Sequence, residues 1–216
     1  YAAGGVDFVL DDWSLAGYRA AHGAMTDVFL RSRPGTWAVQ TVGYGIAGEH
    51  PLVLFGLVTA LFLVVTLLLH RVLLRFLAPT LALAVAAVWV VLPNHNTIAL
   101  WGATMPTLVA LALLLGAVLL LADGRWLPAA VLLAASVLTY ELFVPLCLVA
   151  PFLVPGRPLL DPPGHAVRLV HRFAAAGAPL LASAYVAARP LYHRTVRLPD
   201  PVVFWLKVGN VFVPEV

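Results

Sequence analysis

The chain has 216 residues, of which 62% are hydrophobic and 11% are charged, with a formal net charge of +3. An ordinary soluble domain is about half apolar and roughly a quarter charged, so this composition excludes a water-soluble fold. The basic residues are scattered between apolar runs and form no basic stripe, which argues against nucleic-acid binding. The lone cysteine, Cys147, excludes an internal disulfide and a thiolate metal site.

Residues 1–50 combine charged, polar and aromatic side chains and predict an extramembrane or interfacial first loop. Between Ser14 and Phe29 the apolar residues recur every three or four positions, which is typical of a surface helix with one apolar face. The Arg-Pro-Gly sequence at 33–35 ends this helix, and a second short helix is expected over 36–46.

Three apolar runs are expected to cross the bilayer before residue 123, because about 20 apolar helical residues match its hydrocarbon thickness. They cover 51–69, 78–92 and 105–122. Arg71 and Arg75 follow the first run and predict a cytoplasmic end. The loop that contains Asn94, His95 and Asn96 should then lie on the outer side.

The apolar run over 127–154 is too long for one untilted span and too short for two, and Tyr140-Glu141 interrupts it. Two short helices that meet near Glu141 are favoured, with a cytoplasmic connector over 155–172 and an outward crossing over 173–188. A single tilted helix is the alternative, and it would invert everything that follows.

The sequence therefore predicts an all-α, polytopic transmembrane helical bundle with an outer first loop that carries amphipathic helices. The expected parts are the first loop over 1–50, about six membrane helices, some short, over 51–190, and a truncated outer loop over 191–216. Tyr1 follows no signal sequence and Val216 ends the chain abruptly, so both ends are expected to be cuts in a longer protein.

Asp11 and Asp12 are adjacent carboxylates in the first loop. Their mutual repulsion is offset where they bind a divalent cation, or where one acts as a general base and the other orients it. A structural role is the alternative: either acid can cap the helix that begins at Trp13, where the helix dipole favours negative charge.

Further polar residues on the predicted outer side could bind a substrate. Arg33 and Arg31 suit a phosphate, although arginines beside a membrane also anchor lipid headgroups. His95, like His22 and His50, is a further candidate for the phosphate, and the alternative for the segment that contains His95 is a polar turn. Trp101 could stack on a sugar ring, and its alternative role is that of an interfacial aromatic residue.

Tyr140 and Glu141 lie at the predicted helix break. An ionisable group at the bilayer centre costs at least ~2.5 kcal/mol, so Glu141 should face a cavity or contact an arginine or polar group of the first loop. Alternatively, the break lifts Glu141 to the outer interface, where water solvates it.

The order of these motifs resembles the GT-C superfamily of polytopic glycosyltransferases, which includes the protein O-mannosyltransferases and the lipid A aminoarabinose transferases. The resemblance spans about residues 1–155 and depends on three motifs. These are Asp11-Asp12 in the first outer loop, Arg33-Pro34 after an amphipathic helix, and Tyr140-Glu141 in a broken membrane helix. The first span and the later half of the superfamily's pattern are missing from this sequence, so no acceptor-side residue can be carried over.

The resemblance implies an inverting enzyme of a bacterial inner membrane, with its active site on the outer side. It would move a sugar from a polyprenyl-phosphate donor to a glycan, lipid or protein acceptor, with the first-loop acid Asp11 or Asp12 as the catalytic residue. A divalent cation is the one cofactor that the two acids suggest. The alternatives are a transporter or flippase-like protein, in which Glu141 and the first-loop acids couple ions or substrate to movement, and a non-catalytic membrane subunit.

Overall fold

The protein is described by a computed structural model that covers residues 11–25, 30–31, 33–48, 50–92, 101–153 and 162–192. Within these ranges every regular element is a helix, so the predicted all-helical fold is confirmed for this part. Three helices are long and apolar enough to cross a membrane, over Pro51–Leu73, Gly102–Ala122 and Leu169–Val186. Three shorter helices are also apolar, over Pro79–Val91, Trp126–Thr139 and Glu141–Phe152.

The described elements, in chain order, are α1 (Asp11–His22), α3 (Pro34–Ala47), α4 (Pro51–Leu73), α5 (Pro79–Val91), the 3-10 turn η1 (Gly102–Thr104), α7 (Met105–Ala122), α8 (Trp126–Thr139), the 3-10 turn η2 (Glu141–Phe143), α9 (Val144–Leu153) and α10 (Pro162–Tyr192). Prolines occupy the first or second position of six of these helices, α3, α4, α5, α7, α9 and α10. Proline suits this position because its fixed φ is already helical and its missing N–H would have no partner there.

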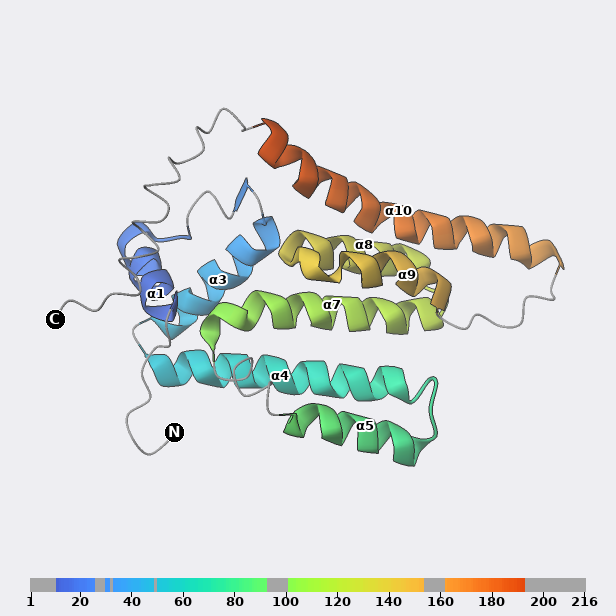
Figure 1. The fold of residues 1–216 in the computed structure, drawn as a ribbon, viewed down its shortest axis with the longest axis horizontal. Helices are drawn as coiled ribbons and strands as arrows, with labels where there is room; N and C mark the ends of the chain where they lie inside the picture. The colour runs from blue at the N-terminus through green and yellow to red at the C-terminus, as the bar shows by residue number, and fades with distance from the viewer. Residues whose placement is uncertain are drawn as a thin grey trace, which may run out of the picture.

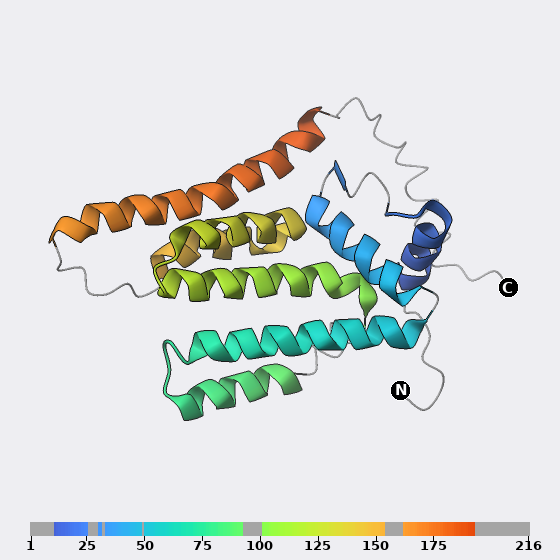
Figure 2. The same cartoon turned by 180° about the vertical axis from the view of Figure 1, so that it is seen from behind.

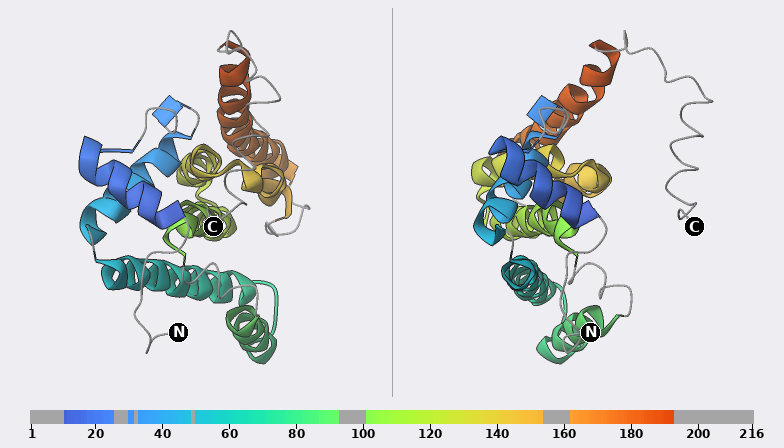
Figure 3. Two further views of the ribbon diagram at one scale, coloured as in Figure 1. Left: turned by 60° about the vertical axis from the view of Figure 1, so that its left-hand side comes forward. Right: turned by 90° about the vertical axis from the view of Figure 1, so that its left-hand side faces the viewer.

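Helices α4, α5, α7, α8 and α9 run side by side as a bundle, and α10 lies along it at an angle (Figures 1 and 2). Helices α1 and α3 lie across one end of this bundle, as the end-on view in Figure 3 shows. We call this the α1/α3 end; it also contains η1 and the α8–η2 junction. The opposite end contains the turns at 74–78 and 123–125.

Two apolar clusters hold the bundle together. The first joins α3, α4 and α7 through residues such as Tyr44, Leu54 and Leu108, and the second joins α7, α8 and α9 through Leu114, Leu133 and Cys147. Other large apolar side chains remain outside, for example Leu52 at 70% and Leu67 at 65% exposed on α4. So much exposed apolar surface suits contact with lipid.

Over its described part, 127–153, the apolar run over 127–154 forms two helices, α8 and α9, with η2 between them, which confirms the favoured prediction over a single tilted helix. The first-loop boundaries differ from those expected. Helix α1 begins at Asp11 and ends at His22, before Gly23, whose φ of 74° is left-handed. Residues 26–29 and 193–216 lie outside the described ranges, so the rest of the periodic pattern and most of the predicted outer loop are not described.

Candidate functional site

Asp12 lies in the first turn of α1, and its side chain is 0% exposed. Three donors reach its carboxylate. The Tyr44 hydroxyl donates to Oδ1 over 2.6 Å, the Ala103 N–H to Oδ1 over 2.8 Å, and the Gly102 N–H to Oδ2 over 3.1 Å. Burying a carboxylate is costly unless its oxygens are paired, and these donors meet that need.

This contact caps the 3-10 turn η1, which precedes α7. The first N–H groups of a helix have no partner within it, and a carboxylate placed there is favoured by both hydrogen bonding and the helix dipole. Asp12 provides such a cap for η1, which leads directly into α7. The capping alternative therefore fits Asp12, but the capped helix belongs to another part of the chain. The Asp11 side chain lies outside the described part.

Three further hydrogen bonds fix α1 and the residues after it on α3. Arg19 Nε donates to the Thr41 carbonyl over 3.1 Å, and the Met25 N–H donates to Thr41 Oγ1 over 3.1 Å. Trp37 Nε1 donates to the Met25 carbonyl over 2.9 Å. In its described part, the first loop is therefore held together by hydrogen bonds between α3 and the segment from α1 to Met25.

Arg33 and Glu141 form an ion pair between Arg33 Nη2 and Glu141 Oε1. The Arg33 guanidinium also lies over the Tyr140 ring, 5.4 Å from its centroid, in a cation–π contact. The expected contact between Glu141 and an arginine of the first loop is therefore present. The pair is only partly buried, at 37% and 40% exposed, while Glu141 Oε2 is buried without a hydrogen-bond partner among the described residues.

The two polar groups lie at opposite ends of α3. Asp12 contacts Tyr44 near the C-terminal end, whereas Arg33 immediately precedes Pro34 at the N-terminal end. At ~1.5 Å per residue, Arg33 and Tyr44 are about 16 Å apart along the helix. The structure therefore brings Arg33, Tyr140 and Glu141 together, but it does not bring Asp12 to them.

Trp101 immediately precedes Gly102, whose N–H donates to Asp12. Its indole Nε1 is buried and has no hydrogen-bond partner in the part of the chain that the structure describes. His95, Asn94 and Asn96 lie outside the described residues. The described residues contain no group of three His, Cys, Asp or Glu side chains that could hold a metal ion.

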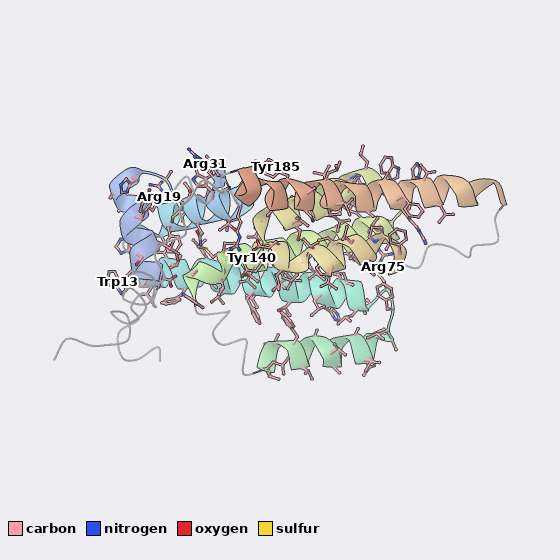
Figure 4. All side chains as sticks on the ribbon, turned by 45° about the horizontal axis from the view of Figure 1, so that its top comes forward. Trp13, Arg19, Arg31, Arg75, Tyr140 and Tyr185 are labelled. Carbon is pink, nitrogen blue, oxygen red and sulfur yellow. The ribbon has the colours of Figure 1, made fainter. Side chains whose placement is uncertain are left out.

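The remaining candidates are more exposed. Arg31 is exposed near the start of α3, and His50 is exposed before α4. His22 is also exposed, and its ring stacks on Tyr18 with centroids 4.2 Å apart. Figure 4 shows Trp13, Arg19 and Arg31 at the α1/α3 end and Arg75 at the opposite end.

Tyr44 and the N–H groups of Gly102 and Ala103 are site residues that the sequence did not single out. Tyr44 is separated from Asp12 by 32 positions and Ala103 by 91, so no local pattern connects them. One signal was present: Tyr44 lies one helical turn from Gln40 and two from Thr36, on a polar buried face of α3.

Comparison with known proteins adds no family to this geometry. No protein-family model matches the sequence, and neither a curated protein nor a solved structure matches it significantly.

Proposed function

We propose that this protein is a membrane-embedded, inverting glycosyltransferase that moves a sugar from a polyprenyl-phosphate donor to an acceptor outside the membrane. One observation carries the proposal: the described part of the first loop lies across one end of an apolar bundle, and two groups of polar residues lie there. These groups are Asp12 with Tyr44 and Trp101, and Arg33 with Tyr140 and Glu141.

The proposed topology puts the α1/α3 end outside the cytoplasm. Arg71, Arg75 and Arg125 lie at the opposite end, and arginines next to membrane helices favour the cytoplasmic side. Helices α4, α7 and α10 would cross the bilayer, and the shorter helices would complete the bundle.

Asp11 is the proposed general base. The buried Asp12 oxygens already accept three hydrogen bonds, so Asp12 is less suited than Asp11 to take a proton. We assign Asp12 a positioning role, because it holds α1 against η1. In the reaction, the acceptor oxygen would attack the anomeric carbon while its proton passes to Asp11. The bond from that carbon to the phosphate oxygen would break, and the electron pair would leave with the polyprenyl phosphate.

Arg33 and Tyr44 are about 16 Å apart along α3, so the polar groups at the two ends of this helix are assigned to different substrates. The departing phosphate must lie within a few ångströms of the reacting carbon, and therefore near Asp11. We assign sugar stacking to Trp101, which immediately precedes Gly102, a donor to Asp12. We assign phosphate binding to His95, which lies six positions before Trp101 in the sequence. Arg33, Arg31, Tyr140 and Glu141 would then contact the acceptor.

A non-catalytic membrane subunit is the second candidate, because the bonding of Asp12 is fully explained by its structural role. A transporter has less support. Transporters of the inverted-repeat type pair two broken helices, and within the described residues only the 127–154 run is broken in this way.

The test is donor consumption by the full chain in phospholipid nanodiscs. The donors are radiolabelled polyprenyl-phosphate mannose, glucose and arabinose, offered with a bacterial envelope extract as acceptor. We expect one donor to be consumed, and Glu141→Gln to raise the KM for the acceptor with little change in the KM for the donor. Failure to consume any donor, in protein shown to be folded, would favour the subunit.

A further inference from the structure

An apolar groove of about 390 Å³ runs along the outside of the bundle between α3, α4 and α7. All of its lining residues are apolar or glycine, and they include Val42, Ile46, Leu57, Leu61 and Val109. Val42 and Ile46 on its α3 wall are 59% and 60% exposed. Since α4 and α7 are candidate membrane spans, the groove would face the hydrocarbon of the bilayer.

A cation lies at the edge of this groove. A Cβ atom built on Gly45 would lie 3.0 Å from Arg19 Nη2, so the guanidinium rests on α3 at Gly45. Val42, which lines the groove, lies three positions before Gly45, where side chains on a helix surface are neighbours. Arg19 is therefore close to the Val42 edge of the groove.

Arg19 is held in place but has unused donors. Its Nε atom donates to the Thr41 carbonyl, which fixes the plane of the guanidinium. Its terminal nitrogens have no acidic partner among the described residues. The end-on edge of the guanidinium, which has one N–H from each terminal nitrogen, matches two oxygens of a phosphate, and the contact with Thr41 already restricts the side chain.

We propose that this groove and Arg19 form a binding site for an anionic diacyl phospholipid, with one acyl chain in the groove and the phosphate on Arg19. The positive charge of Arg19 complements the anionic headgroup, and the apolar lining of the groove suits an acyl chain. A phospholipid is the favoured occupant because phospholipids are the medium that surrounds α4 and α7. The proposal uses none of Asp11, Arg33 and Glu141, so it does not depend on the proposed function.

The test is equilibrium lipid binding to the full chain in detergent, followed by native mass spectrometry. The probes are phosphatidylglycerol, phosphatidylcholine and undecaprenyl phosphate. We expect one phosphatidylglycerol to bind more tightly than phosphatidylcholine. Arg19→Gln should weaken that binding about fivefold, the effect of one cation beside an anionic lipid. Val42→Trp, which fills the groove at an exposed position, should also weaken it.

Two variants serve as matched controls. Arg125→Gln removes an exposed arginine from the opposite end, and Val88→Trp enlarges an exposed valine on α5. Both should bind phosphatidylglycerol as the unmodified chain does. Equal binding by all four variants would overturn the proposal. Binding of undecaprenyl phosphate that Arg19→Gln and Val42→Trp weaken, with phosphatidylglycerol binding unchanged, would overturn it too, because the site would then belong to a different lipid.

Discussion

A fully buried carboxylate at position 12 must be paired, and the structure pairs it with three donors from two other elements. The arrangement links α1, α3 and η1 through one side chain. Asp12 therefore has a structural role whether or not the site is catalytic. Asp11, its neighbour, carries the proposed chemistry.

Replacing Asp12 should destabilise the fold. In Asp12→Asn the amide nitrogen is itself a donor and would face donors, so we expect the free energy of unfolding to fall by about 3 kcal/mol. Tyr44→Phe removes one charge-assisted hydrogen bond and should cost about 1.5 kcal/mol. Unfolding by SDS titration, followed by tryptophan fluorescence, measures both losses.

Asp123→Asn is the control for this series. Asp123 pairs with Arg75 over 2.8 Å at the opposite end, where both side chains are about half exposed, so its loss should cost less than about 1 kcal/mol. If Asp12→Asn were as stable as Asp123→Asn, the capping role of Asp12 would be wrong.

Helix α3 is positioned by close contacts that require glycine. A Cβ on Gly35 would overlap the Thr139 backbone and side chain, and a Cβ on Gly43 would lie 2.5 Å from the flexible end of Met105. Gly35→Ala should therefore destabilise the protein by about 2 kcal/mol, and Gly43→Ala by less than about 1 kcal/mol, because the methionine can move. The same SDS titration measures the difference.

Gly56→Ala is the matched variant on α4, where an added Cβ meets nothing within 4 Å. It should be neutral, or stabilising by up to ~1 kcal/mol through helix propensity. A Gly35→Ala protein as stable as Gly56→Ala would contradict the close approach of α3 to α8.

The Arg33–Glu141 pair ties the start of α3 to the junction of α8 and α9. A double-mutant cycle with Arg33→Gln and Glu141→Gln should give a coupling free energy of about 1 kcal/mol, a modest value because the pair is partly exposed. The same cycle on Arg75 and Asp123, which are more exposed, should give about 0.3 kcal/mol. Equal coupling free energies for the two pairs would contradict a specific contribution of Arg33–Glu141 to holding α3 against the α8–α9 junction.

Over the whole molecule, much of the helical framework was predictable because it follows from local hydropathy. The break at Glu141 was also predictable, since a charged residue inside an apolar run needs a partner. The partners of Asp12 were not, because contacts with Tyr44 and Ala103 depend on how α3 and η1 pack in three dimensions. The separation of Arg33 from Asp12 was not predictable either. It depends on the contact of Asp12 with Tyr44, which lies at the end of α3 away from Arg33.

Topology can be tested with single cysteines, because Cys147 is the only native one and can be replaced by alanine. Cysteines at Ser14 and Leu142, both exposed at the α1/α3 end, should react with a membrane-impermeant maleimide in intact cells. A cysteine at Arg125 should react only after permeabilisation. Labelling of all three in intact cells would contradict the proposed orientation.

The most direct test of the proposed function is the rate of sugar transfer by Asp11→Asn, in the nanodisc assay with polyprenyl-phosphate donors. Removing a general base should lower the rate by about 100-fold or more, while the free energy of unfolding stays within ~0.5 kcal/mol of the unmodified chain. Undiminished transfer by folded Asp11→Asn would contradict the assignment of Asp11 as the base.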